Sequence, residues 1–134
     1  MTSLLASRDA GLLVIRLAIG LSLAFLHGIG KVPPAERFIA GVTDMGFPLP
    51  VLFAWAAGLS EFVGGLLVAI GLFTRPAAAS IAITMAVAAF IRHAGDPLGD
   101  RELPIVFLCI ALGVLLTGAG AFSVDAWWQQ RRTK

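Results

Sequence analysis

Apolar residues gather along this chain in four long blocks separated by short polar segments. The blocks cover residues 11–30, 51–73, 77–92 and 103–122. A helix rises about 1.5 Å per residue and a bilayer core is about 30 Å thick, so a stretch of roughly 20 apolar residues can cross it. The blocks lack the strict alternation that a half-buried strand requires. The pattern predicts an all-α membrane protein, a four-transmembrane-helix bundle forming a single domain over residues 1–134.

The polar segment between the first two blocks carries its own pattern. Pro34 can occupy the first turn of a helix. The apolar residues that follow fall on one side of such a helix: Phe38, Ile39, Val42 and Met45. We therefore expect a short amphipathic helix over residues 35–45 that lies in the membrane interface.

Composition agrees with a protein that is surrounded by lipid. Only 13% of the residues are charged, whereas soluble domains carry about 25%. Ten basic and eight acidic residues are scattered between the blocks, so no basic stripe indicates a nucleic-acid partner. Cys109 is the only cysteine, which excludes an internal disulfide and a thiolate metal cluster. We expect the lipid bilayer as the main partner, and neither a metal cluster nor a covalent cofactor.

Basic residues and tryptophans predict the orientation. Four crossings place both termini on one side of the membrane. That side would carry Arg8, Arg75, Arg131, Arg132 and Lys134, against Lys31, Arg37, Arg92 and Arg101 on the other. Trp127 and Trp128 precede the basic tail and suit a membrane interface. We predict cytoplasmic termini, with the loops 31–50 and 92–102 facing outward.

Two charged residues lie inside the apolar blocks. Arg16 is about one helical turn inside the first block, where it can extend its guanidinium to the headgroups. Glu61 is near the middle of the second block, too deep to reach water, and must be paired, protonated or hydrated. Small residues at Ala54, Gly58 and Gly65 give its helix a flat face that allows another helix to approach closely. A neutral Glu61 bonded to a neighbouring helix is the alternative.

The polar residues of the first block share one helix face. Arg16, Gly20, Leu23 and His27 recur at the spacing of a 3.6-residue period. If this face meets Glu61, then Arg16, Glu61 and His27 form a chain of candidate catalytic residues along one internal cavity, with Arg16 and Glu61 coupled. The alternative is that His27 is only an interface residue.

A second candidate group lies at the predicted outer mouth. His27 and Lys31 end the first block, and the 92–102 loop adds His93 and Glu102. These four residues could converge on a ligand there, so Lys31, His93 and Glu102 are candidate ligand-binding residues. The alternative is that the charged loop is simply solvated.

The order of these residues resembles the DoxX family of small bacterial membrane proteins. The resemblance rests on short motifs spread over nearly the whole chain: Arg16-Leu17 with Gly20, His27-Gly28-x-x-Lys31, Ala57-Gly58-x-x-Glu61-x-x-Gly64-Gly65, Gly71-Leu72-x-Thr74-Arg75, Met85 with Ala88, Glu102, and Gly118-Ala119-Gly120-x-x-Ser123-x-Asp125. It implies a four-helix membrane fold and a place near quinone-linked or thiol-linked electron transfer. Relatives of that kind include a subunit of thiosulfate:quinone oxidoreductase and a membrane partner of secreted thiol-detoxifying and superoxide-removing proteins.

Two functions follow as hypotheses. In the first, the chain is a component of a redox system in the bacterial inner membrane, binding a quinone-like or thiol-linked molecule while buried polar residues handle protons. The sequence supplies no electron carrier, so electrons would come from a second bound molecule or a soluble redox partner protein. In the second, the chain is a non-enzymatic scaffold subunit or a small-solute carrier. A homo-oligomer is expected for a carrier, because four short helices are few for a transporter.

Overall fold

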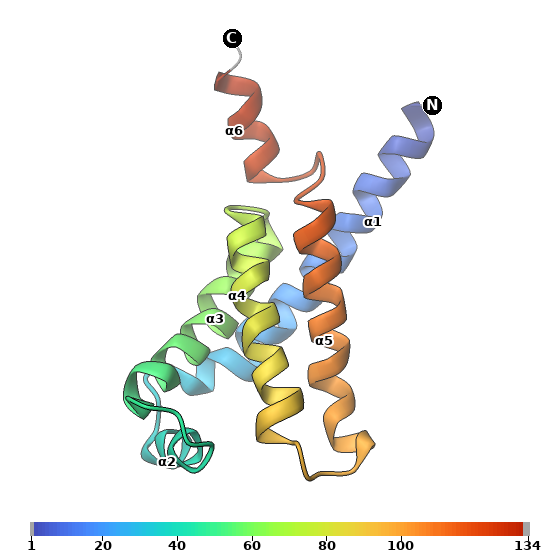
Figure 1. Cartoon of the computed structure of the whole chain (residues 1–134). Coiled ribbons are helices and arrows are strands. Elements are labelled where there is room, and N and C mark those ends of the chain that lie inside the picture. The colour runs from blue at the N-terminus through green and yellow to red at the C-terminus, as the bar shows by residue number, and fades with distance from the viewer. Residues whose placement is uncertain (1, 133–134) are drawn as a thin grey trace.

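The computed structural model describes residues 2–132, and four long helices run antiparallel to one another within this range (Figure 1). α1 (Thr2–Leu21) continues through a π-helix, η1 (Ser22–Gly28), and a 3₁₀ turn, η2 (Ile29–Lys31). The other three long helices are α3 (Pro50–Ile70), α4 (Thr74–Val87) with a second π-helix, η3 (Ala88–Arg92), and α5 (Leu98–Thr117). Two short helices complete the order, α2 (Glu36–Asp44) and α6 (Val124–Arg132).

Both described chain ends lie at one end of the bundle (Figure 1). We call this the terminal end; it also holds the α3–α4 turn and the segment from α5 to α6. The opposite end, with α2 and the turn between η3 and α5, is the loop end. The two described chain ends therefore share one end of the bundle, and their side of the membrane stays a prediction.

Three of the continuous helical segments are long and apolar enough to cross a membrane. They are Leu4–Lys31, Pro50–Ile70 and Thr74–Arg92. α5 has 20 residues and packs antiparallel to α4, but its first turns contain Asp100, Arg101 and Glu102. α5 also ends before the predicted 122, because Gly118 leaves the helix with a φ of 79°. An all-α architecture with three candidate spans is thus established, whereas the fourth crossing stays a prediction.

Glycines bring the backbones of the first helix and α3 into direct contact. A Cβ on Gly20 would lie 2.4 Å from the carbonyl oxygen of Gly65, and one on Gly28 would lie 2.4 Å from the backbone nitrogen of Phe62. A Cβ on Gly58 would approach the Lys31 carbonyl oxygen to 2.7 Å. Side chains larger than hydrogen do not fit at these points. The predicted close approach of another helix around Glu61 is confirmed.

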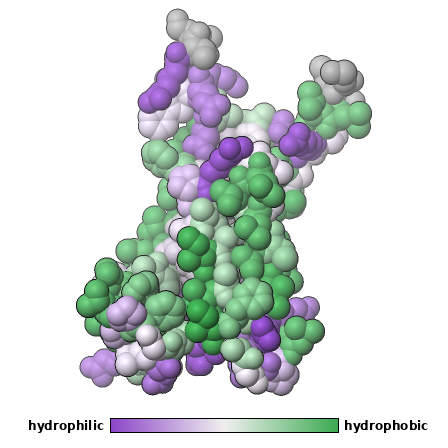
Figure 2. All heavy atoms as spheres, in the orientation of Figure 1, coloured by the Kyte–Doolittle hydropathy of each residue, from purple (hydrophilic) through white to green (hydrophobic). Residues whose placement is uncertain are grey.

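The core is small and the outer surface is apolar. Buried residues from all four long helices form one cluster, whose larger members are Ile19, Leu23, Val68, Ile81, Met85 and Val114. Many other large apolar side chains point outward, including Leu26, Leu52 and Leu116 at 61–78% exposure. On the face shown in Figure 2, apolar residues cover the middle and hydrophilic residues gather towards both ends. Such a surface suits contact with lipid.

The short amphipathic helix between the first two spans is present as α2. Val42 is buried, while Phe38 and Ile39 are half-buried, and the helix packs on α3. Pro34 lies just before the N-cap residue Ala35 rather than in the first turn. The position of α2 in the membrane interface stays a prediction.

Candidate functional site

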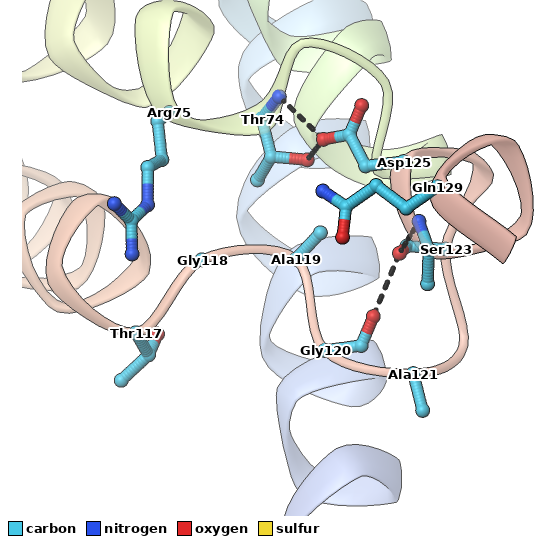
Figure 3. A pocket seen from close by; sticks show the side chains of 11 residues that line it. Thr74, Arg75, Thr117, Gly118, Ala119, Gly120, Ala121, Ser123, Asp125 and Gln129 are labelled. Atoms are coloured by element: carbon cyan, nitrogen blue, oxygen red, sulfur yellow. Dashed lines mark hydrogen bonds between the residues drawn. The ribbon is translucent and has the colours of Figure 1, made fainter. Parts of the chain in front are cut away.

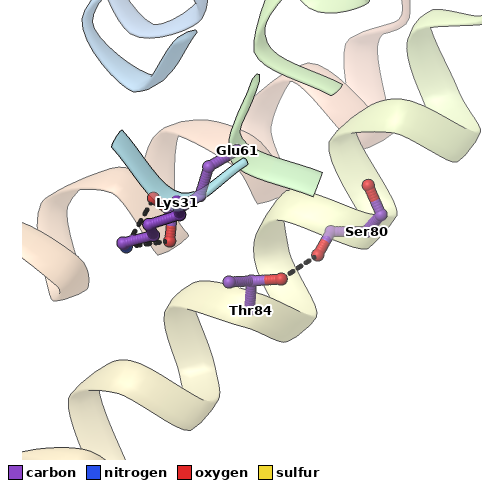
Figure 4. Close-up of polar contacts among 4 residues, drawn as sticks. All are labelled: Lys31, Glu61, Ser80 and Thr84. Atoms are coloured by element: carbon purple, nitrogen blue, oxygen red, sulfur yellow. Dashed lines mark hydrogen bonds and ion pairs between the residues drawn. The ribbon is translucent and has the colours of Figure 1, made fainter. Parts of the chain in front are cut away.

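The glutamate in the middle of α3 is paired with a lysine of the same chain. The Lys31 Nζ lies 2.7 Å from Oε1 and 2.6 Å from Oε2 of Glu61, so the ammonium group bridges both carboxylate oxygens (Figure 4). Glu61 is only 3% exposed. The Lys31 side chain is 30% exposed, and its Nζ lies 5.4 Å from the centre of the Phe38 ring. The pair therefore joins a buried carboxylate to a partly open position at the loop end.

The π-helix decides which residue of the first helix faces Glu61. A regular 3.6-residue period places His27 on the face of Arg16 and Gly20. The wider turns of η1 shift the register, so Gly28 takes this place and packs against the backbone of Glu61 and Phe62. His27 turns towards α5 instead, where its ring makes an edge contact with Phe107 at 5.8 Å between centroids. No described hydrogen bond or ring contact joins His27 to Glu61, and a site shared by the two residues stays a prediction.

Arg16 lies beside the C-terminal end of α3, whereas Glu61 lies in the middle of that helix. Its Nη1 donates to the carbonyl oxygen of Ala119, and its Nη2 donates to that of Phe122 at 2.7 Å. A Cβ on Gly71 would lie 3.0 Å from the guanidinium, which places Arg16 ten residues beyond Glu61 along α3, about 15 Å away. The expected chain through Arg16, Glu61 and His27 is therefore not formed. Arg16 does not reach outward to the headgroups either, because it is only 1% exposed.

Asp125 ties α6 to the start of α4. Its Oδ1 accepts from the Phe73 N–H at 2.9 Å, and its Oδ2 accepts from the Thr74 N–H at 3.0 Å and the Thr74 hydroxyl at 2.8 Å. Burial opposes ionisation of this carboxyl group, but these hydrogen bonds and nearby Arg16 outweigh it and hold the pKa of Asp125 below its ordinary value. The Asp125 N–H also donates to the Gly71 carbonyl oxygen.

Three further contacts shape the segment between α5 and α6. The Ser123 hydroxyl donates to the Gly120 carbonyl oxygen at 2.7 Å and accepts from the Ala126 N–H at 3.1 Å, which caps α6. Asp9 of α1 accepts from the Ala121 N–H at 3.1 Å. We call this network around Arg16, Thr74, Ser123 and Asp125 the terminal cluster. Of these four residues, only Arg16 was assigned to a candidate site from the sequence; the signal for Ser123 and Asp125 was the glycine-rich motif that precedes them.

The candidate ligand-binding residues of the loop end do not form one site. His93 Nδ1 lies 2.6 Å from Asp96 Oδ2 in the turn before α5, and Lys31 is held by Glu61. Glu102 is exposed on α5. Within residues 2–132, no hydrogen bond or ion pair joins His27, His93 or Glu102 to the Lys31–Glu61 pair. The predicted convergence at an outer mouth is therefore absent from the described contacts.

Two hollows mark the surface near the terminal end. The first, which we call the terminal pocket, has a volume of about 570 Å³ and is lined by Thr74, Arg75, Thr117, the 118–121 turn, Ser123 and Asp125, among others (Figure 3). The second, which we call the apolar groove, has about 350 Å³ and lies between α1 and α5. Neither is lined by Glu61 or His27. These two hollows are thus distinct from the predicted cavity, even though Glu61 points into the bundle.

The chain belongs to the DoxX family. The family model matches residues 11–94. This range includes the glycines that bring the first helix into contact with α3, and both partners of the Lys31–Glu61 pair. The resemblance drawn from the motifs is confirmed. No solved structure gives a significant match.

Curated relatives are similar over almost the whole chain. "Inner membrane protein YphA" of Escherichia coli is 32% identical over 129 residues, covering 90% of this chain and 91% of that protein. "Putative oxidoreductase CatD" of Bacillus subtilis is 29% identical over 120 residues, covering 89% and 87%. "Inner membrane protein YqjF" of Escherichia coli is 32% identical over 124 residues, covering 87% and 91%.

Proposed function

We propose that this DoxX protein is a membrane-embedded component of a redox system in the bacterial inner membrane, and that its Lys31–Glu61 pair handles protons beside a quinone-like or thiol-linked small molecule. The pair carries the proposal, because it is a carboxylate and an ammonium group held in contact within a membrane span. The names of the relatives support the setting: two are called inner membrane proteins and one an oxidoreductase.

The geometry of the pair fits proton transfer to a buried site. Glu61 is almost fully enclosed, whereas Lys31 is partly open at the loop end, so the two groups link the surface to the interior. Reduction of a quinone takes up two electrons and two protons, and a general acid within hydrogen-bond reach supplies such protons efficiently. The electrons would come from a bound thiol reductant or a soluble redox partner protein.

The proposed topology has four crossings with both termini in the cytoplasm. α5 packs along α4 over a length that is enough to span, and its charged first turns lie at the loop end. The terminal end carries five described arginines, against one lysine and three arginines at the loop end, in the sense of the positive-inside rule. Alkaline phosphatase fused after residue 134 should be inactive. An active fusion would place the terminal end outside.

Small-molecule mass spectrometry and enzyme assays test the redox proposal. We expect the protein, purified in mild detergent, to carry a quinone-like or thiol-containing molecule, and to support quinone reduction with a thiol reductant. Glu61→Gln should keep the helical content and lose this activity, because the amide cannot exchange a proton. Asp44→Asn, which changes an exposed carboxylate on α2, is the matched control. Full activity of Glu61→Gln would remove the pair from the mechanism.

One observation favours the scaffold function instead. The buried carboxylate of Glu61 already has its partner within the chain, and the guanidinium of Arg16 bonds two backbone carbonyls. The Glu61 carboxylate therefore needs no ligand to be paired, although the buried Nε of Arg16 has no partner among the described residues. If the protein co-purifies with a soluble redox enzyme, and if its Glu61→Gln variant keeps that association without any bound small molecule, the scaffold function is correct.

A further inference from the structure

The terminal pocket and the apolar groove adjoin each other at one residue. Thr117, the last residue of α5, lines both of them. The groove is walled by α1 residues on one side, among them Val14 and Ile15, and by α5 residues including Ile110 and Val114 on the other. Val14 and Ile15 are 66% and 45% exposed. A polar hollow therefore lies next to an apolar one whose wall includes exposed apolar side chains.

A gap at Gly113 keeps the groove open along α5. Gly113 lines the groove, and a Cβ placed on it would have no neighbouring atom within 4 Å. By contrast, the glycines between the first helix and α3 are filled by backbone of the facing helix. The α1–α5 groove therefore has room for an apolar chain that does not come from the bundle itself.

Arg75 gives the terminal pocket a cation available for binding. Its exposed guanidinium lies beside the Gly118 turn, where a Cβ on Gly118 would be 3.5 Å from the Arg75 Nε (Figure 3). Among the described residues, Arg75 has no hydrogen bond or ion pair. Asp125, the carboxylate of the same pocket, is already held by Phe73 and Thr74. The pocket therefore presents a guanidinium group to which no carboxylate of the described residues is bonded.

The charges of the terminal end favour an anion in this pocket. Five arginines lie there (Arg8, Arg16, Arg75, Arg131 and Arg132), with only two aspartates in the described residues of that end. Asp9 and Asp125 both accept backbone hydrogen bonds. Arg131 and Arg132 stack on Trp127 and Trp128, which suit the headgroup level of a membrane. Basic residues at that level attract anionic lipids.

We propose that the terminal pocket and the apolar groove together bind one anionic phospholipid, with its phosphate on Arg75 and one acyl chain between α1 and α5. The shared residue Thr117 carries the proposal, because it places a polar site next to an apolar slot as an amphiphile requires. A free phosphate would make no use of the groove, and the choline cation of phosphatidylcholine would be repelled by the arginines of the terminal end. The proposal does not depend on the redox function or on the Lys31–Glu61 pair.

Native mass spectrometry of the full chain tests the proposal. After delipidation, the protein is titrated with phosphatidylglycerol, with phosphatidylcholine of the same acyl chains, and with inorganic phosphate. We expect one phosphatidylglycerol to bind about tenfold more tightly than phosphatidylcholine, as charge-assisted contacts to phosphate allow. Arg75→Gln should remove this preference. Gly113→Leu should weaken both lipids about tenfold, because leucine fills the groove.

Matched variants control for general effects. Arg92→Gln removes an exposed arginine at the loop end, and Gly99→Leu adds a leucine on α5 where a Cβ is equally unhindered; both should bind as the wild type does. If Gly113→Leu fails to fold, Ala18→Leu fills the groove from α1. Equal binding of the two lipids by the wild type, unchanged binding by both site variants, or equally tight binding of phosphate alone would overturn the proposal.

Discussion

The Lys31–Glu61 ion pair should be strongly coupled in stability, whereas Arg16 and Glu61 should not be. Removing one partner of a buried pair costs about 3–5 kcal/mol, because the remaining charge is left unpaired. The upper end is expected for Lys31→Met, which leaves the buried Glu61 carboxylate unpaired, and the lower end for Glu61→Gln, which leaves a Lys31 side chain that is 30% exposed. Removing both charges in Lys31→Met/Glu61→Gln should cost less than the sum of the single changes by about 2 kcal/mol.

A double-mutant cycle in mixed micelles measures this coupling. Unfolding by added dodecyl sulfate is followed by far-ultraviolet circular dichroism for the wild type, both single variants and the double variant. The cycle of Arg16→Gln with Glu61→Gln is the control. The two groups are about 15 Å apart along α3, so the changes in unfolding free energy should add within roughly 0.5 kcal/mol. Additive effects of Lys31→Met and Glu61→Gln on the unfolding free energy, or a larger coupling between Arg16→Gln and Glu61→Gln, would refute the arrangement described above.

Two further changes test the packing and the terminal cluster. Gly20→Ala should destabilise by several kcal/mol, because its Cβ would meet the Gly65 backbone, whereas Gly11→Ala on the same helix has open space and should be neutral or slightly stabilising in thermal unfolding. Asp125→Asn should cost about 1–2 kcal/mol at pH 7 through the lost cap and charge. The pKa of Asp125 is lowered on folding, so this difference should be full above about pH 4 and shrink as pH falls through the lower native pKa; a pH-independent difference would contradict the assignment.

The membrane class and the approximate helices could be predicted from the sequence, because apolar blocks of span length are unambiguous. The glycine face around Glu61 was also predictable, since small residues at helical spacing favour close packing. The first and last residues of the helices were harder to predict. α5 starts at Leu98 among charged residues, which a hydropathy pattern excludes, and it stops at Gly118, whose positive φ the pattern does not specify.

The partners of the buried charges could not be predicted, because they depend on helix register. A 3.6-residue period was assumed for the whole first helix, and the π-helix η1 breaks it just before Gly28. One shifted residue was enough to turn His27 to α5 and to bring Lys31 onto Glu61. Arg16 was misassigned for another reason: its acceptors are backbone carbonyls about a hundred residues away, which no side-chain pattern reveals.

The family motifs divide between the two ends of the bundle and do different work there. At the terminal end, the side chains of Arg16, Thr74 and Asp125 form hydrogen bonds with backbone atoms and, between Thr74 and Asp125, with each other. These bonds hold the α3–α4 turn against the chain after α5. Towards the loop end, Lys31 and Glu61 form a pair between two side chains, and no backbone hydrogen bond of the described residues depends on either side chain. The Glu61→Gln assay therefore tests the proposed proton transfer while leaving the hydrogen bonds of the terminal cluster intact.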